Sequence, residues 1–215
     1  MGNSAAVVSL EQGNVLVDCG HSVFPTLFRT GIVEEIDAVL VTHFHDDHVG
    51  SLSSLILYHQ IILQKGKLTL LTQDEKFETM LKEFLAFSLG DPTDRVDFRS
   101  VEEWPAITPI DTHGAHVNWM PTWAFLFSEN GESIAYSGDI GDPTPFFTAL
   151  EEHKPPGLKV FHEVGFHKQV SAHTYYKVLE TYLDRYEIYG YHCDHTRKPE
   201  DIKVPLVAES GYLVK

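Results

Sequence analysis

Residues 38–50 read Ala-Val-Leu-Val-Thr-His-Phe-His-Asp-Asp-His-Val-Gly and decide the fold of this chain. The apolar, β-branched beginning predicts a buried strand, and the apolar residues from Ser51 onward have helical spacing. The turn between them holds three His and two Asp, whose neutral nitrogens and carboxylate oxygens are ligands for Zn²⁺ or Mn²⁺. Because side chains in a strand repeat every two residues, His43 and His45 should point the same way. Asp47 and His48 on the turn should reach a second ion, so the pattern predicts a metal site rather than an ordinary polar turn.

The run His-x-His-x-Asp-His at residues 43–48 resembles the signature of the metallo-β-lactamase superfamily. Within it, the chain is most similar to the phosphodiesterase branch, which includes ribonuclease Z and the anti-Pycsar cyclic-nucleotide phosphodiesterases. The resemblance implies a four-layer αββα sandwich that forms a single domain over residues 1–215. Periodicity by itself supports an α/β or α+β protein.

Alternating and helical apolar patterns predict the elements of this fold. Strands are expected at 5–10, 14–18, 36–42, 68–72, 96–99, 107–112, 133–136, 158–163 and 187–191. Helices are expected at 22–30, 51–63, 74–87, 144–152 and 172–184, with a hairpin turn at 129–131 and a closing hairpin at 206–214. His59, inside the second helix, is expected on its surface and not as a ligand.

Composition limits the classes of partner. The chain has 215 residues, 16 of them basic and 31 acidic, for a formal charge of −15. An acidic surface repels polyanions and disfavours a broad RNA or DNA interface. Cys19 and Cys193 form no Cys-x-x-Cys pair and are expected as packing residues without a metal role. Without a signal-like N-terminus or a long apolar run, the protein is expected in the cytoplasm and off the membrane.

The resemblance also implies the remaining ligands of two divalent ions, with Zn²⁺ ahead of Mn²⁺. His116 is the expected third-motif ligand, with His113 as the alternative, and His192 the last ligand, with His195 as the alternative. One ion would take His43, His45 and His116, the other would take Asp47, His48 and His192, and Asp139 would bridge them.

Asp18, in Asp18-Cys19-Gly20, is expected to orient a metal-binding His, with an Asx turn as the alternative.

Two divalent ions against two carboxylates and one hydroxide leave about one positive charge, which suits a phosphodiester monoanion attacked by the bridging hydroxide. The leaving alkoxide then needs a proton. By resemblance to ribonuclease Z, Glu163 polarises His173, and His173 donates that proton. The alternative is that His173 is a polar residue at a helix start capped by Ser171. Asp47, Glu163 and His173 are therefore the expected catalytic residues.

The segment between His116 and Asp139 is filled by one hairpin and lacks the long basic arm with which ribonuclease Z grips tRNA. A small phosphodiester is therefore expected as substrate. The anti-Pycsar resemblance implies hydrolysis of 3′,5′-cyclic nucleotides to nucleoside monophosphates by a homodimer, with ribonuclease Z-like RNA 3′-processing as the alternative. Aromatic residues that could stack on a base, or belong to the core, are Trp119, Trp123, Phe166 and Tyr175.

Overall fold

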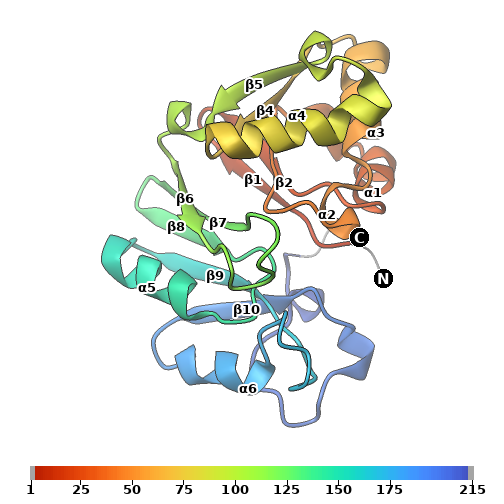
Figure 1. The fold of residues 1–215 in the computed structure, drawn as a ribbon. Coiled ribbons are helices and arrows are strands. Elements are labelled where there is room, and N and C mark those ends of the chain that lie inside the picture. The colour runs from red at the N-terminus through yellow and green to blue at the C-terminus, as the bar shows by residue number, and fades with distance from the viewer. Residues whose placement is uncertain (1–2, 213–215) are drawn as a thin grey trace. The chain divides into compact units, whose positions relative to one another are not determined.

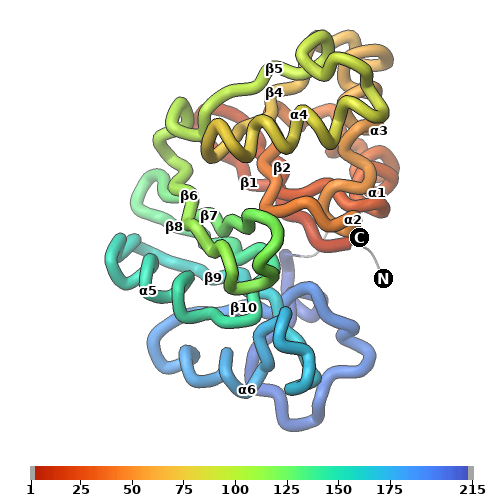
Figure 2. The backbone as a smooth tube through the Cα atoms, in the orientation of Figure 1, coloured from red at the N-terminus to blue at the C-terminus, as the bar shows by residue number. Residues whose placement is uncertain are grey.

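The computed structural model describes residues 3–212 and divides into two compact units, which meet in the sequence between Pro105 and Ala106. Figures 1 and 2 show the course of the chain through both units. Each unit contains one five-stranded sheet among these described residues. The prediction of a single domain over 1–215 stays a prediction, and the units are described in turn.

The N-terminal unit is built on a mostly parallel sheet of order β1-β2-β3-β4-β5. Its strands are β1 (Ala6–Leu10), β2 (Gly13–Val17), β3 (Ala38–Leu40), β4 (Leu68–Thr72) and β5 (Val96–Ser100). The first two pair antiparallel, which confirms the predicted hairpin, and the other neighbours pair parallel. Every residue of β3 is buried, as expected for a central parallel strand. The turns after β2 and β3 therefore leave the sheet at the same edge.

The helices of this unit are α1 (Val23–Thr30), α2 (Asp46–Val49), α3 (Leu52–Leu57) and α4 (Glu75–Leu89). They follow the predicted pattern with two changes, the first of which is that the short helix α2 stands where a turn was expected within the metal motif. Short 3₁₀ turns lie at Ile32–Glu35, Pro92–Asp94 and Val101–Glu103. The predicted helix 51–63 continues after α3 as a π-turn, η2 (Tyr58–Ile62).

The expectation that His59 lies on the surface is wrong. This residue is 6% exposed, and its Nδ1 atom lies 3.3 Å from the carbonyl oxygen of Gly66. The wider π-turn rotates the side chains away from the α-helical register, so a position that should face solvent turns inward.

The C-terminal unit has a sheet of order β10-β9-β8-β7-β6. Its strands are β6 (Ile107–Asp111), β7 (Trp123–Glu129), β8 (Glu132–Tyr136), β9 (Leu158–Glu163) and β10 (Glu187–Tyr191). β6, β7 and β8 form an antiparallel meander, whereas β8, β9 and β10 run parallel. Asn130 and Gly131 both have positive φ at the β7–β8 turn, as a tight hairpin requires, which confirms the predicted turn.

Two helices, α5 (Thr144–His153) and α6 (Tyr176–Leu179), pack with the sheet around one apolar core. The helix predicted at 172–184 is too long at both ends, since α6 is followed by the 3₁₀ turn Glu180–Tyr182. It cannot begin at residue 172 because the backbone of Thr174 is bonded to Glu163 and to Gly165 instead. The earlier residues therefore form a loop.

The predicted closing hairpin is wrong within the described residues. Val207–Glu209 forms a 3₁₀ turn, and Leu206 makes only an isolated bridge to Gly190. Another 3₁₀ turn lies at His195–Arg197. The last predicted hairpin residues, from 213 onward, lie outside the described residues. Across 3–212, no helix combines the length and the apolar character that crossing a membrane demands.

Candidate metal centre

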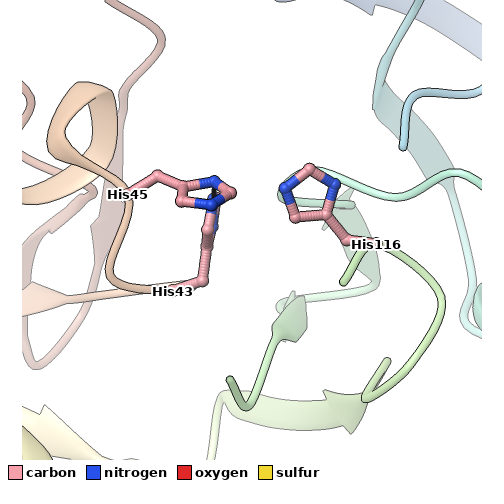
Figure 3. Close-up of side chains that lie close together, drawn as sticks. All are labelled: His43, His45 and His116. Atoms are coloured by element: carbon pink, nitrogen blue, oxygen red, sulfur yellow. Dashed lines mark hydrogen bonds between the residues drawn. The ribbon is translucent and has the colours of Figure 1, made fainter. Parts of the chain in front are cut away.

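Four potential ligands gather after β3, and we call them the N-terminal cluster: His43, His45, Asp47 and His48. His45 keeps an extended backbone, and α2 starts directly after it, so the chain turns sharply within the motif. Nε2 of His43 lies 3.0 Å from Nδ1 of His45, and the two side chains meet at the loop after β3 in Figure 3. The rings of His43 and His48 lie 4.1 Å apart. Nε2 of His48 is 3.7 Å from a carboxylate oxygen of Asp47, so the motif forms one compact donor group.

Asp18, directly after β2, contacts the N-terminal cluster through its carboxylate. It is fully buried, and its backbone has a left-handed φ of 65°. The carboxylate accepts hydrogen bonds from the amide of Thr42 at 2.8 Å and from its hydroxyl. It also lies 2.8 Å from Nδ1 of His48, which is the contact expected of a residue that orients a metal-binding His.

These contacts select one tautomer for two imidazoles. Because Asp18 can only accept, Nδ1 of His48 carries the proton. The hydroxyl of Thr42 gives its own hydrogen to Asp18, so it accepts from Nδ1 of His43 at 3.0 Å. In both rings the lone pair then lies on Nε2, the form in which His binds a metal.

The turn that follows Asp18 supports the motif through the backbone. The Cys19 amide donates to the carbonyl of His48 at 2.6 Å, and the Ser51 hydroxyl donates to the carbonyl of Gly20 at 2.6 Å. A Cβ on Gly20 would lie 1.8 Å from the carbonyl oxygen of Asp47, so only glycine fits there. Cys19 forms no disulfide and is fully buried, and burial raises the pKa of its thiol to about 12. It is a packing residue, as expected.

The C-terminal unit brings together a second donor group, the C-terminal cluster: His116, Asp139, His173 and His192. His116 and Asp139 lie in loops beyond the ends of β6 and β8, and His192 directly follows β10. Donor atoms of His116, Asp139 and His173 all lie within 4.8 Å of one another. Nε2 of His192 is 3.3 Å from Oδ2 of Asp139, and the His192 backbone has a left-handed φ of 59°.

His116 shows the same tautomer selection as the first cluster. Its Nδ1 atom donates to the carbonyl of Ala172 at 2.6 Å, which leaves the lone pair on Nε2. Figure 3 draws this side chain too, which belongs to the C-terminal unit. The alternative, His113, is exposed and lies near the carbonyl of Met120 instead. His195, the alternative to His192, is exposed in its 3₁₀ turn. Neither alternative belongs to the cluster.

Glu163 and His173 are paired as the sequence predicts. Oε2 of Glu163 lies 3.3 Å from Nδ1 of His173, and Oε1 accepts from the amide of Thr174 at 2.7 Å. Burial raises the pKa of the Glu163 carboxyl, and the hydrogen bond from His173 opposes that rise. Nδ1 of His173 is also 3.9 Å from Oδ2 of Asp139. The alternative, a helix start capped by Ser171, is wrong because no helix begins there.

The four aromatic candidates for base stacking differ in environment. Trp119 is 73% exposed, and Trp123 is half-buried. Phe166 and Tyr175 pack against the core beside Tyr176. Their core role therefore accounts for the last two, and base stacking stays a prediction.

A family model described as anti-Pycsar protein Apyc1 matches residues 1–206. The chain belongs to this family. An anti-Pycsar protein Apyc1 from Bacillus phage BSP38 is 30% identical over 186 residues, which cover 76% of this chain and 71% of the relative. One from Bacillus phage vB_BsuM-Goe3 is 32% identical over 157 residues, which cover 64% and 61%. The chain thus spans about two thirds of the length of these phage relatives.

Solved structures confirm the predicted fold class for this family member. The metallo-β-lactamase fold protein YhfI from Bacillus subtilis matches with a TM-score of 0.66 at 17% identity, over 90% of this chain and 80% of its own. The short form of human tRNase Z matches with a TM-score of 0.66 at 16% identity, over 95% and 89%. The mixed α/β chain with two sheets therefore has the metallo-β-lactamase fold.

Proposed function

We propose that this chain is a metal-dependent phosphodiesterase that hydrolyses 3′,5′-cyclic nucleotides to nucleoside monophosphates. The carrying observation is that His43, His48 and His116 each have Nδ1 bonded to an acceptor. All three therefore have the lone pair on Nε2, where it can bind a metal. Ordinary surface histidines do not need such an acceptor on Nδ1. Membership of the anti-Pycsar family supports the substrate class.

The donor set fits divalent ions. The N-terminal cluster offers imidazole nitrogens and the carboxylate of Asp47, and the C-terminal cluster adds further imidazoles and the carboxylate of Asp139. Such a nitrogen-rich set favours Zn²⁺ over Mn²⁺, which prefers oxygen. We assign the ligands of two ions as the family signature orders them: His43, His45 and His116 for one, Asp47, His48 and His192 for the other, and Asp139 for both.

Bound ions would supply Lewis-acid activation of the phosphodiester and of the attacking water. The chain supplies the proton. His173 in its protonated form donates to the leaving alkoxide from Nε2, while Glu163 holds Nδ1 and fixes the ring orientation. Glu163 is fully buried, and in this low-dielectric environment its attraction to a charged imidazole is stronger than it would be in water.

Two features support a small substrate. The loop and the hairpin of β7 and β8 occupy the interval between His116 and Asp139, so no long arm projects there. The formal charge of −15 opposes binding of a long polyanion. Homodimer formation and a cytoplasmic location stay predictions.

A substrate panel tests the proposal. Purified protein is incubated with Zn²⁺ or Mn²⁺ and with cyclic mononucleotides, cyclic dinucleotides or a tRNA precursor, and the products are separated by chromatography. Cyclic mononucleotides should be hydrolysed far faster than the tRNA is cut. Cleavage of the tRNA with intact cyclic nucleotides would instead establish the ribonuclease Z-like alternative.

Metal content gives the matched control. Elemental analysis should find two ions per chain, and His116→Ala should lose metal and activity together. His113→Ala removes an exposed histidine from the same loop and should keep both. Equal behaviour of the two variants would refute the assignment of His116.

A further inference from the structure

Three neighbouring strand ends carry the chemistry of the C-terminal unit. Asp139 follows β8, Glu163 ends β9 and His192 follows β10, and these strands lie side by side in Figure 1. The two proposed ligands are thus separated by a whole strand, yet Nε2 of His192 lies 3.3 Å from Oδ2 of Asp139. Something must hold the outer two strand ends at a fixed separation.

Tyr191, the last residue of β10, spans this gap. Its hydroxyl donates to the carbonyl of Gly138 at 2.8 Å, one residue before Asp139. Its ring stacks on that of Tyr136 in β8, with centroids 4.7 Å apart and planes within 14°. Since the backbones of β8 and β10 are two strand spacings apart, roughly 9–10 Å, the side chains must lean toward each other over β9.

Ser137 completes the connection to the middle strand. Its hydroxyl donates to the carbonyl of Gly138 at 2.6 Å and accepts from the amide of Glu163 at 3.0 Å. It also lies 3.2 Å from the hydroxyl of Tyr191. The carbonyl oxygen of Gly138 therefore accepts hydrogen bonds from two hydroxyl groups, that of Ser137 directly after β8 and that of Tyr191 at the end of β10.

We infer that Tyr191 is a positioning residue that sets the distance between Asp139 and His192 and thereby the metal affinity of this unit. The inference rests on the proposed function. The hydroxyl anchors the peptide before Asp139 to the residue before His192, so both ligands move as one body. His192 holds a positive φ that a residue with a Cβ adopts only under constraint. Its position therefore depends on contacts such as this one.

Tyr191→Phe tests the inference because it removes only the hydroxyl and keeps the stacked ring. The affinity for Zn²⁺, measured by competition with a chelator, should fall about 10–100-fold, the usual effect of losing a group that orients a ligand. With saturating Zn²⁺, kcat should fall and KM should change little, because the substrate contacts are intact.

Tyr189→Phe is the matched control. Tyr189 lies on the same face of the same strand, and its hydroxyl donates a hydrogen bond to Oε1 of Glu187 at 2.6 Å. Its zinc affinity should equal that of the unmodified chain. Ser137→Ala removes the other hydroxyl on Gly138 and should weaken zinc binding in the same direction, which gives a second test if Tyr191→Phe does not fold.

The outcomes separate the two proposals. If the unmodified chain binds two Zn²⁺ and is active, but Tyr191→Phe and Ser137→Ala bind zinc like Tyr189→Phe, the inference is overturned and the proposed function stands. A loss of stability in the metal-free protein with unchanged zinc affinity also overturns it, because the role is then structural. An unmodified chain that binds no Zn²⁺ overturns both.

Discussion

Nδ1 of His173 lies 3.3 Å from Oε2 of a fully buried carboxylate, that of Glu163. The other oxygen of Glu163 accepts a hydrogen bond from the amide of Thr174, so each of the two carboxylate oxygens has a partner that fixes its position. A buried acceptor in this position orients one imidazole nitrogen and increases the basicity of the other. The proton donor assigned above depends on this pair.

His173→Ala should lower kcat by about 10²–10⁴-fold, the contribution of a positioned proton donor. It should leave two ions bound, because His173 is not among the assigned ligands. The decrease should be smaller on a nitrophenyl phosphodiester, whose leaving group needs no proton. Steady-state kinetics and elemental analysis check both parts. Loss of one ion would show that His173, within ligand distance of Asp139 and His116, binds metal.

Glu163→Gln should show a weaker form of the same kinetic pattern. The amide keeps the size of the side chain but not its charge, so the ring of His173 is still held but less basic. A decrease in kcat as large as that of His173→Ala would assign Glu163 a direct part in proton transfer.

Asp18→Asn should lower the affinity for Zn²⁺ by about 10–100-fold, since the amide cannot accept the Nδ1 proton of His48 in the same way. Asn tolerates the left-handed backbone at this position, so the fold should persist. Chelator competition provides the measurement. Asp37→Asn is the control, because this exposed carboxylate accepts from the amide of Asn14, away from the cluster. Equal affinities for the two variants would contradict the role of Asp18.

His162 should make the metal-free protein sensitive to acid. Burial against Phe146 and Phe147 lowers the pKa of this histidine to about 4. In the unfolded chain this histidine has a pKa near 6.5, so as the pH falls it is protonated there before it is protonated in the folded protein. Its contribution to the free energy of unfolding is therefore present above pH 6.5 and is lost as the pH falls toward 4. Between pH 6.5 and 5 the free energy of unfolding should fall by about 1–2 kcal/mol more than in His162→Gln. Urea unfolding at each pH measures the free energy of unfolding of both proteins. The same pH dependence in the unmodified protein and in His162→Gln would contradict the prediction.

Both cysteines should resist alkylation in the folded protein. Burial raises the pKa of Cys19 to about 12 and that of Cys193 to about 11. At pH 8 the thiolate fraction of Cys19 is then about a thousandfold below that of an ordinary thiol. Mass spectrometry after iodoacetamide should find both cysteines largely unmodified in buffer and both modified in urea. Rapid labelling of Cys19 in buffer would contradict its burial.

Sequence patterns predicted those features that depend on neighbours along the chain. The grouping of His43, His45 and His48 could be predicted because strand and turn geometry bring residues at this spacing together, whatever the rest of the chain does. The helix expected at 172–184 failed because the amide of Thr174 binds the carboxylate of Glu163, an interaction between distant segments. His59 was misplaced because nothing in its local sequence marks the π-turn.

Tyr191 escaped prediction for a related reason. Its importance comes from the carbonyl of Gly138, which lies two strands away in the sheet and more than fifty residues away in sequence. Only the strand order β10-β9-β8 brings the two together. A tyrosine beside a candidate ligand is the signal that could have raised the question.

The left-handed backbone of His192 sets stability against function in this protein. This conformation costs roughly 1–2 kcal/mol for a residue with a Cβ, and glycine would relieve that cost. A screen that selects variants by thermal stability alone should therefore enrich His192→Gly. Those survivors would have exchanged a proposed metal ligand for a relaxed chain. Directed evolution of a more robust form of this fold should hold this position constant from the start.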